Sequence, residues 1–549
     1  MGAKKTTWQI ATSIAVSLII GILIGNFISG KSLGRSLFLT PNNKINVILD
    51  IINEDYVDPI NLKEMTEGAI VNIINELDPH SNYIPGSELQ TVNVDMEGHF
   101  GGIGASFFIH KDTIVITNLV YGGPSSQAGL LPGDRIIYVN DSLFTGPEIT
   151  EDKILNTLRG PVGSTVKLGI QRDFSDAIIT YRIKRNNILL TTVKAFYEVK
   201  KGIGFIKIYD KFSHSTYDEF MQAATKLIAQ GCTSFILDLR MNSGGSFEVA
   251  GKIINEFLPA DRMIVYAEGK SFPRIETISD GSGIFPENQL VVLIDQMSAS
   301  ASEIVAGAIQ DNDRGLIIGR RSFGKGLVQN QIELSDGSAV RLTIARYYTP
   351  SGRNIQRKYQ LGKSDEYNQE WINRINSGEG FYEDSVKIDK SLVYNTISGR
   401  PVYGNGGIMP DIFVPIDTTH LSTYYINLNN KDIFNKFAFE YSDKNRKILN
   451  TFKDHLSMLE YLKTQPVLYE IVRFAEENGV KKRTFMINRY SNQILLTTYA
   501  CILSNFFGDE AFYQVYLSDD PVIAKAIEAI RKGDAFPQTI ASMKYKELQ

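Results

Sequence analysis

Two uninterrupted apolar runs, each leading into a helical pattern, constrain the fold of this chain most. Residues 234–239 read Ser-Phe-Ile-Leu-Asp-Leu and continue through a Gly-Gly turn into a helical pattern. Residues 290–294 read Leu-Val-Val-Leu-Ile, and a second helical pattern follows them. A strand that is apolar at almost every position is buried on both faces, and alternation of such strands with helices is typical of an α/β core. We therefore predict an α/β domain over residues 188–430.

The rest of the chain divides into regions with different hydrophobic patterns. Several domains are expected, because 549 residues exceed what one hydrophobic core accommodates. Residues 40–96 have helix-like apolar spacing. Residues 97–187 carry short β-like runs separated by glycine turns, and residues 431–549 are again helical in pattern. The predicted fold class is therefore multidomain α+β, with an α/β core, a β-rich module, a helical lead-in and a helical C-terminal extension.

The N-terminus predicts a membrane anchor. Residues 1–9 contain Lys4 and Lys5, and residues 10–30 contain no charged side chain. That length fits one bilayer crossing, which takes about 20 residues. By the positive-inside rule, residues 1–9 would be a cytoplasmic stub and the remainder would lie on the periplasmic, extracytoplasmic side of the cytoplasmic membrane. A cleaved signal peptide remains the alternative for residues 10–30.

Composition excludes several function classes. The net charge of −4 gives no broad basic surface for nucleic acid. Two cysteines and six histidines show no metal-ligand spacing, and no phosphate-binding glycine loop of the Walker type is present. We therefore expect no metal, no cofactor and no nucleic-acid partner.

The second apolar run leads into a serine-rich helix start. Residues 298–303 read Ser-Ala-Ser-Ala-Ser-Glu, and Ser300 with Glu303 fits a capping box. A serine at such a start can also be a nucleophile, because helix N-terminal amides favour the negative charge that forms on attack. From the residues alone, both interpretations of Ser300 stay open.

A nucleophilic serine needs a base, and no histidine lies near this segment in the sequence. Lys325 lies in the glycine-flanked turn Ser322-Phe323-Gly324-Lys325-Gly326. Lysine serves as a base only if burial or like charge lowers its pKa from the usual value of about 10.4. Arg320 and Arg321 would contribute if they point inward. An ordinary surface lysine remains the alternative.

Residues 291–329 closely resemble the carboxyl-terminal processing (tail-specific) serine peptidases. In that family, a Ser-Ala-Ser-Ala-Ser-Glu run is followed by Phe-Gly-Lys-Gly-x-Val-Gln, as it is here. The resemblance implies that Ser300 is the nucleophile, that Lys325, 25 residues later, is the general base, and that Gln329 orients the lysine. It also implies a serine-protease core of the ClpP/crotonase-like type.

Further polar residues of these motifs receive structural interpretations. Asp311 matches an acidic position of the family, and we interpret it as structural. His80, in Leu77-Asp78-Pro79-His80-Ser81, receives the same interpretation. Ser298 and Ser302 remain alternative nucleophiles.

The resemblance also locates an oxyanion hole. One donor would be the amide of Ala301, which follows the nucleophile, and the other the amide of Gly244. Gly244 belongs to Asn242-Ser243-Gly244-Gly245, where the family has Asn-Pro-Gly-Gly. Ser243 in place of proline removes a fixed φ but leaves the Gly244 amide in place.

The β-rich module resembles the PDZ domain of these peptidases. Gly101-Gly102-Ile103-Gly104 lies where a carboxylate-binding loop is expected, and residues 128–136 read Ala-Gly-Leu-Leu-Pro-Gly-Asp-Arg-Ile. Loop amides bind a terminal carboxylate while a strand edge takes the peptide by β-addition. Gly102, Ile103 and Gly104 are therefore the predicted peptide-binding residues.

Together these features predict a serine endopeptidase of the cell envelope that binds unfolded or tail-exposed proteins and cleaves them with a Ser-Lys dyad. Two alternatives remain: an inactive PDZ scaffold at the membrane, and a hydrolase of small esters or amides. A homo-oligomer is compatible with the sequence. Residues 431–549 resemble no family that we can name. We predict that they form a packing or oligomerisation appendage, with substrate gating as the alternative.

Overall fold

The computed structural model describes residues 17, 44–120, 122–172, 177–418 and 422–534. The chain divides into two compact units, Met1–Leu77 and Asp78–Gln549. In the first unit, helices α2 (Lys44–Asp55) and α3 (Leu62–Asn75) confirm the predicted helical character. Helix α3 begins at a conventional cap, since the side chain of Asn61 accepts a hydrogen bond from the Glu64 amide at 3.3 Å.

The predicted membrane localisation is contradicted. Within residues 17, 44–120, 122–172, 177–418 and 422–534, no helix is both long and apolar enough to cross a bilayer. Except for Ser17, the predicted anchor over residues 10–30 lies outside the described residues, as does the stub over residues 1–9. That prediction came from the run of uncharged residues that follows Lys4 and Lys5.

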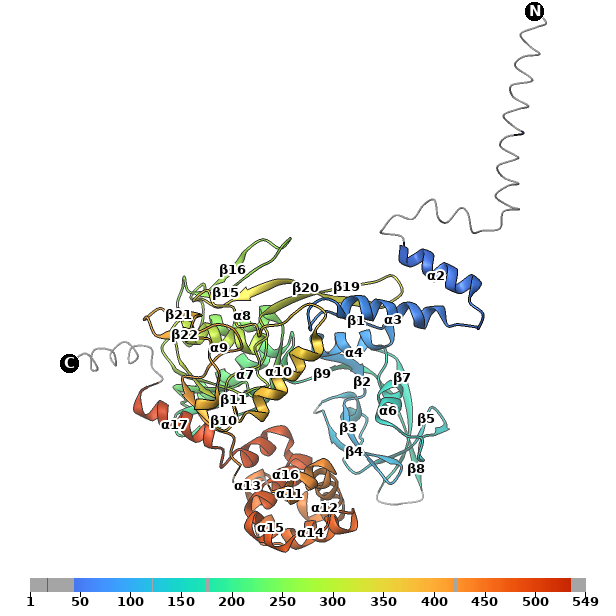
Figure 1. Ribbon diagram of the computed structural model, residues 1–549. Helices are drawn as coiled ribbons and strands as arrows, with labels where there is room; N and C mark the ends of the chain where they lie inside the picture. Colours follow the sequence, from blue (N-terminus) through green and yellow to red (C-terminus); the bar gives the residue numbers. More distant parts are fainter. Residues whose placement is uncertain (1–16, 18–43, 121, 173–176, 419–421, 535–549) are drawn as a thin grey trace, which may run out of the picture. The chain divides into compact units, whose positions relative to one another are not determined.

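A six-stranded sheet forms the centre of the second unit (Figure 1). Its strands, in spatial order, are β10 (Val193–Lys200), β11 (Ile203–Ile208), β13 (Ser234–Asp238), β17 (Gln289–Ile294), β18 (Leu316–Gly319) and β23 (Ile412–Phe413). From β11 to β23 the strands are parallel, and β10 pairs antiparallel with β11. The α/β core predicted from the two apolar runs is therefore confirmed.

Helices cover both faces of this sheet, which explains why the strands are apolar throughout. On one face, alternate strand residues such as Leu237 and Val292 pack under α7 (Thr216–Ala229), α8 (Phe247–Asn255) and α9 (Ala301–Asp311). On the other face, the intervening residues, including Ile236 and Val291, pack against α17 (Pro521–Lys532). A C-terminal helix thus completes the core of the protease-like domain.

A second sheet lies beside the core and carries one wall of the candidate site. Its strands are β1 (Asn82–Ile84), β20 (Ala339–Tyr348), β15 (Met263–Glu268), β16 (Ile275–Ile278) and β19 (Leu327–Glu333). Strands β19 and β20 pair antiparallel, with a register shift between Val328 and Gln329. The remaining short elements of this region are α4 (Gly86–Glu97), β12 (Asp210–Phe212), β14 (Asn242–Gly245), α10 (Ser364–Asn376), the 3-10 turn Glu383–Ser385, β21 (Val393–Asn395) and β22 (Pro401–Tyr403).

The β-rich module forms its own sheet and core. Its strands are β3 (Ala105–His110), β4 (Thr113–Leu119), β5 (Arg135–Val139), β6 (Ser142–Leu143), β7 (Thr165–Gln171) and β8 (Ile178–Lys184), with helices α5 (Pro124–Gln127) and α6 (Glu151–Leu158). A separate ribbon of β2 (His99–Gly102) and β9 (Asn186–Leu189) pairs the two ends of the module. Strand β3 is an edge strand, as a β-addition site requires.

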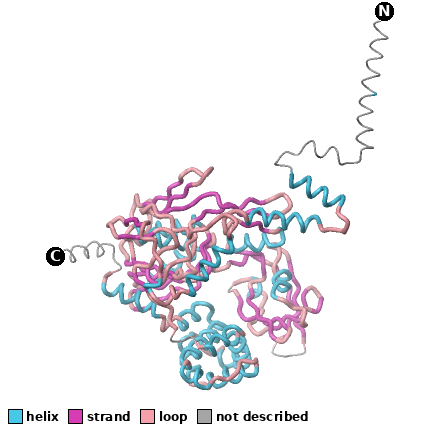
Figure 2. Tube along the Cα trace, viewed as in Figure 1, coloured by secondary structure: helices cyan, strands magenta, loops and turns pink. Residues whose placement is uncertain are grey.

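The C-terminal region is helical, as predicted. Its helices are α11 (Thr423–Asn430), α12 (Ile433–Leu449), α13 (His455–Lys463), α14 (Val467–Glu477), α15 (Thr484–Arg489) and α16 (Ser491–Tyr516). They share one apolar core and gather into a bundle that is almost entirely helical in Figure 2. Helix α16 bends at Gly508, whose φ is 76°. Because α11 already belongs to this core, the bundle begins before the predicted boundary at residue 431.

Candidate active site

Ser300 lies in the loop between β17 and α9 with an unusual backbone conformation. Its φ is 53° and its ψ is −113°, a strained combination for a residue with a side chain. Such strain costs on the order of 1–3 kcal/mol and persists only where the surrounding structure enforces it. Here the neighbour is Gly244, where a Cβ atom would lie only 2.6 Å from the Cβ of Ser300. The close approach of the two backbones therefore requires glycine at position 244.

The three serines of this segment differ in availability. The hydroxyl of Ser298 donates to the carbonyl of Leu239 at 2.9 Å, and that of Ser302 donates to the side-chain oxygen of Asn242 at 2.8 Å; both serines are fully buried. Ser300 is only partly buried, and it forms a capping box with Glu303 at the start of α9. The geometry therefore favours Ser300 over both alternative nucleophiles.

The buried carboxylate of Glu303 joins the Ser300 loop to the Lys325 turn. One of its oxygens, Oε2, accepts the amide N–H of Ser300 at 2.9 Å and that of Lys325 at 2.8 Å. The other, Oε1, accepts the Ser322 hydroxyl at 2.5 Å and the Gly324 amide at 2.7 Å. Burial raises the pKa of Glu303 to about 7, although these four donors favour the ionised form. One side chain thus holds both predicted catalytic residues by their backbones.

Tyr347 of β20 contacts the carbonyl groups of the same two residues, Ser300 and Lys325. Its hydroxyl lies 3.1 Å from the carbonyl oxygen of Ser300 and 2.6 Å from that of Lys325. Its ring is buried, and burial raises the pKa of the phenol well above its usual value. Helix α9, the turn before β19 and strand β20 therefore converge on the pair. Among the described residues, no hydrogen bond joins Ser300 Oγ directly to Lys325 Nζ.

The surroundings of Lys325 favour its neutral form. Burial is the largest cause that lowers the pKa of its ammonium group, and the guanidinium of Arg341 lowers it further. Glu303 and Asp78 act in the opposite direction. Burial and the nearby Lys325 also lower the pKa of His80 to about 3, so His80 is a neutral neighbour. A lysine in this environment is chemically able to accept a proton, and the role of Lys325 as general base stays a prediction.

The arginines expected to lower this pKa point elsewhere. Arg320 donates to the side-chain oxygen of Gln296 at 3.0 Å, and Arg321 donates to the carbonyl of Gly406 at 2.5 Å. Arg341, on strand β20, takes the place that they were expected to fill. Sequence adjacency suggested the wrong arginines because the one that affects the lysine electrostatically lies on β20, 16 residues further along the chain.

Gln329 lies on β19, and its side chain is hydrogen-bonded to Thr343, which is in turn bonded to Asp78. Its amide nitrogen donates to the hydroxyl of Thr343 at 3.2 Å, and Thr343 donates to Asp78 at 2.9 Å. Asp78 also accepts the Ser81 hydroxyl at 2.6 Å. In the described residues no hydrogen bond joins Gln329 to Lys325, so the orienting role of Gln329 remains a prediction.

The two amides predicted to form the oxyanion hole differ in their hydrogen bonding. The amide of Ala301, at the start of α9, has no hydrogen-bond partner among the described residues. The amide of Gly244 donates to the side-chain oxygen of Asn242 at 3.0 Å. An oxyanion hole that uses both amides therefore requires Gly244 to exchange that bond for one to the substrate.

The predicted carboxylate-binding loop has free amides. Ile103 accepts the Ser125 amide at 2.9 Å and Gly104 accepts the Val120 amide at 3.0 Å, both through their carbonyl oxygens. The amides of Ile103 and Gly104 make no hydrogen bond to a described residue. Gly102 ends β2 and pairs with β9. Two loop amides next to an edge strand suit a terminal carboxylate.

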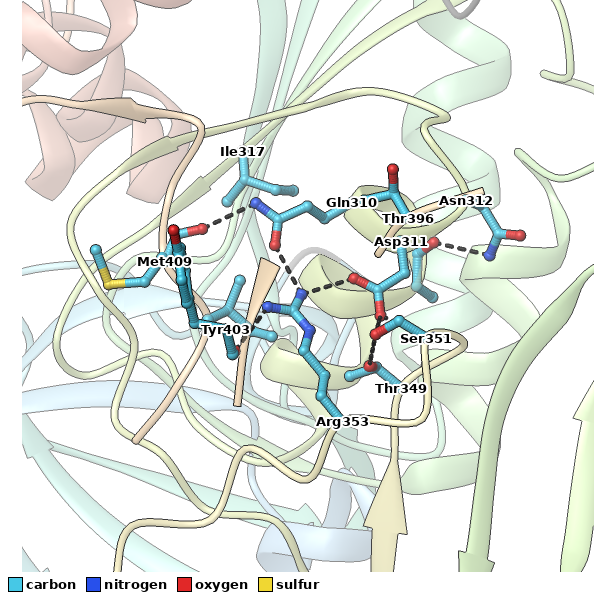
Figure 3. Close-up of polar contacts among 12 residues, drawn as sticks. Gln310, Asp311, Asn312, Ile317, Thr349, Ser351, Arg353, Thr396, Tyr403 and Met409 are labelled. Atoms are coloured by element: carbon cyan, nitrogen blue, oxygen red, sulfur yellow. Dashed lines mark hydrogen bonds and ion pairs between the residues drawn. The ribbon is translucent and has the colours of Figure 1, made fainter. Parts of the chain in front are cut away.

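Asp311 occupies a buried ion pair at the end of α9, away from the reacting groups (Figure 3). Arg353 donates to its carboxylate at 2.7 Å and to the side-chain oxygen of Gln310 at 2.8 Å. Ser351 donates to the other carboxylate oxygen at 2.7 Å. Both charged groups are completely buried. These contacts agree with the structural interpretation of Asp311.

Comparison with known proteins gives three matched regions. Residues 202–363 match the model of peptidase family S41, residues 101–181 match the PDZ domain, and residues 424–508 match a family of unknown function. The carboxy-terminal-processing protease of Bartonella bacilliformis is 32% identical over 331 residues, which cover 58% of this chain and 75% of that protein.

This chain belongs to the carboxy-terminal-processing protease family. The "Probable CtpA-like serine protease" of Staphylococcus haemolyticus is 35% identical over 317 residues, which cover 57% of this chain and 62% of that relative. The match therefore spans less than two thirds of the first relatives' length. The photosystem II D1 C-terminal processing protease is a solved structure with 24% identity and a TM-score of 0.35, covering 69% of this chain and 89% of that one.

Several site residues of this S41 family member escaped prediction. Glu303 was interpreted only as a helix cap, although it also binds the Lys325 turn. Arg341 and Thr343 lie on β20, in a segment with no distinctive spacing. Asp78 carried a signal, since it begins the Asp-Pro-His-Ser segment whose turn it closes through Ser81. Apart from the local Asp78–Ser81 turn, these contacts are non-local, so sequence spacing could not show them.

Proposed function

We propose that this protein is a serine endopeptidase that cleaves peptide bonds through a Ser300–Lys325 dyad. The observation that carries the proposal is the double bridge between the two residues. Glu303 accepts both their amides, and the Tyr347 hydroxyl contacts both their carbonyls. Membership of the carboxy-terminal-processing protease family supports the same reaction.

The reaction follows from the states of these groups. Neutral Lys325 takes the proton of the Ser300 hydroxyl as the Ser300 oxygen attacks the scissile carbonyl carbon. The Ala301 amide, joined by that of Gly244, stabilises the negative charge on the carbonyl oxygen. Collapse breaks the C–N bond, and protonated Lys325 gives its proton to the leaving amine. Water then attacks the acyl-enzyme with Lys325 again as base, which releases the acid and restores Ser300.

We further propose that the substrates are unfolded or tail-exposed proteins, captured by their C-termini at Gly102, Ile103 and Gly104. The free amides of Ile103 and Gly104 and the edge strand β3 support this assignment. A peptide with a free C-terminus should bind the protein at least 10-fold more tightly than the same peptide with a C-terminal amide, because charged hydrogen bonds contribute about 1.5–3 kcal/mol. Equal binding would contradict carboxylate recognition.

A degradation assay tests the catalytic proposal against the inactive-scaffold alternative. The purified chain should cleave a disordered protein, and Lys325→Met, which keeps the aliphatic stem, should abolish cleavage. Lys358→Met is the matched control, because the side chain of Lys358 is 76% exposed. An inactive wild-type chain that still binds peptide would favour the scaffold.

A further inference from the structure

A buried cluster of charges lies at the carboxyl end of β13, beside the turn that leads to Gly244. Arg240 donates to both carboxylate oxygens of Asp238, at 3.0 and 2.7 Å. Lys207 lies 3.3 Å from the same carboxylate and donates to the carbonyl of Arg240 at 3.2 Å. Burial lowers the pKa of Lys207. Burial acts to raise the pKa of Asp238, but the charges of Arg240 and Lys207 outweigh it and lower that pKa to about 2. Loss of one charged side chain would therefore leave another buried charge of the cluster without its direct partner.

The fourth member comes from the far end of the chain. Asp520 accepts a hydrogen bond from Arg240 at 2.8 Å through its Oδ2 atom. Its Oδ1 atom caps helix α17 by accepting the amides of Val522 and Ile523 at 2.9 and 3.0 Å. One carboxylate thus fixes a helix with one oxygen and Arg240 with the other. Residue 520 lies outside all three matched family regions.

Arg240 connects directly to the turn that contacts the nucleophile. The next residue, Met241, has a left-handed φ of 61° and donates its amide to Asp295 at 3.1 Å. The carbonyl of Asn242 then accepts the amide of Ala299 at 3.0 Å, one residue before Ser300. Two residues further along lies Gly244, the glycine on which a Cβ atom would come within 2.6 Å of the Ser300 Cβ. A displaced Arg240 would therefore move the turn against Ser300.

Charge counting shows why Asp520 matters to this arrangement. Without it, Asp238 would be the one carboxylate directly paired with both Lys207 and Arg240 among the described residues, with Asp295 acting on Lys207 at longer range. With Asp520, the direct ion pairs of Lys207 and Arg240 include two carboxylates. An unpaired buried charge is costly, and the structure relaxes by moving the group toward solvent or another partner.

We propose that Asp520 is a positioning residue for the oxyanion turn, acting through Arg240 on residues 240–244. This inference rests on the proposed peptidase function. The C-terminal segment would then belong to the catalytic machinery of this chain, in addition to covering the sheet. Because the turn contributes to the oxyanion hole, loss of Asp520 should weaken transition-state binding more than substrate binding.

The test is steady-state cleavage of a disordered protein by the full chain carrying Asp520→Asn. Asparagine remains a good N-cap, so α17 stays in place while the charge pair with Arg240 is lost. We expect kcat to fall about 10-fold or more with KM unchanged, since only transition-state stabilisation is weakened. Asp520→Ser, which also keeps a capping oxygen, should behave in the same way. Asp519→Asn, at the exposed neighbouring residue, should match the wild type.

Each outcome decides the inference. A lower kcat with unchanged KM and an unchanged thermal midpoint supports it. A kcat within twofold of the wild type in both Asp520 variants would overturn it while leaving the proposed peptidase function intact. A fall in activity that follows a fall in the thermal midpoint would also overturn it, because Asp520 would then act only in stability. An inactive wild-type chain would overturn both proposals together.

Discussion

Glu303 shows how one buried residue defines the geometry of the candidate site. Its two oxygens accept four donors from the Ser300 loop and the Lys325 turn. A carboxylate can accept all four because it carries only acceptor atoms. An amide of the same shape would direct its NH2 group at two of those donors.

Glu303→Gln should therefore reduce kcat by about 100-fold or more, because small displacements of reacting groups have effects of that size. Steady-state cleavage kinetics measure this. Glu248→Gln is the matched control, since Glu248 is also in the first turn of a helix but its side chain is 76% exposed. Wild-type kcat in Glu303→Gln would show that the bridge does not set the active geometry.

The pH dependence of cleavage should report the state of Lys325. Its pKa is lowered by burial and by Arg341, so the rate should rise with pH through a value below the usual lysine pKa of about 10.4. Arg341→Met removes a positive neighbour and raises that pKa, so less neutral lysine exists at a given pH. The rising limb should move to higher pH while the plateau stays the same.

Arg346→Met, at an exposed position of the same strand, is the control for this pH profile and should leave it unchanged. A limb that does not move in Arg341→Met would mean that Lys325 is not the titrating base.

At the scale of single residues, the sequence predicted the site residues that carry a distinctive spacing. It missed the residues that come to the site from other segments of the chain. Ser300 and Lys325 are identified by their motifs, and the structure brings their backbones together. Arg341 could not be identified, because its electrostatic effect on the lysine comes from β20, a segment without a distinctive motif. The contacts of Glu303 with the Lys325 turn could not be identified either, since these donors lie about 20 residues further along the chain.

At the element scale, helix α9 is anchored at both ends by buried charge. Its first turn carries Glu303, and its last residue, Asp311, pairs with Arg353 (Figure 3). The Asp311–Arg353 pair fastens the helix to the loop that follows β20, the strand that carries Tyr347. The position of Ser300 therefore depends on an ion pair that is not itself part of the reaction.

Arg353→Met should destabilise α9 by about 3–5 kcal/mol, because it leaves the Asp311 carboxylate buried without its partner. Hydrogen exchange of the α9 amides measures the local loss. Lys358→Met, which breaks an exposed pair with Asp389, should change protection by no more than about 1 kcal/mol. Unchanged α9 protection in Arg353→Met would contradict the anchoring role.

The elements of the core sheet were predictable, but their coverage was not. The continuous apolar runs indicated strands buried on both faces, and the structure confirms this. The amphipathic pattern over residues 521–532 indicated a helix with one apolar face. It could not show which surface that face covers, because its partners Ile236 and Val291 lie more than 200 residues away.

At the scale of the whole molecule, the C-terminal region is more closely integrated than the predicted appendage. Helix α17 covers one face of the protease-like sheet. Helix α12 of the bundle contacts the PDZ-like module, where Arg135 pairs with Asp443 at 2.7 Å and Phe108 stacks on Phe439. The end of the chain thus contacts both other folded parts of the second unit. The predicted homo-oligomer remains a prediction.

Ala526→Asp should strongly destabilise the molecule, because it places an unpaired charge in the fully buried α17 interface. Ala524→Asp is the matched control. It introduces the same change two residues away, at an exposed position, and should alter stability by about 0.5 kcal/mol or less. Thermal unfolding compares the two variants. Equal thermal midpoints would show that α17 is not part of the core.

The initial rate of disordered-protein cleavage by Ser300→Ala tests the central claim most directly. Ser302→Ala, which changes a buried serine two residues away, is the matched comparison. We expect Ser300→Ala to lower kcat by about 10⁴-fold or more, the scale found when a serine nucleophile is removed. Ser302→Ala should retain measurable cleavage. Persistent cleavage in Ser300→Ala, or loss confined to Ser302→Ala, would contradict the assignment of Ser300 as the nucleophile.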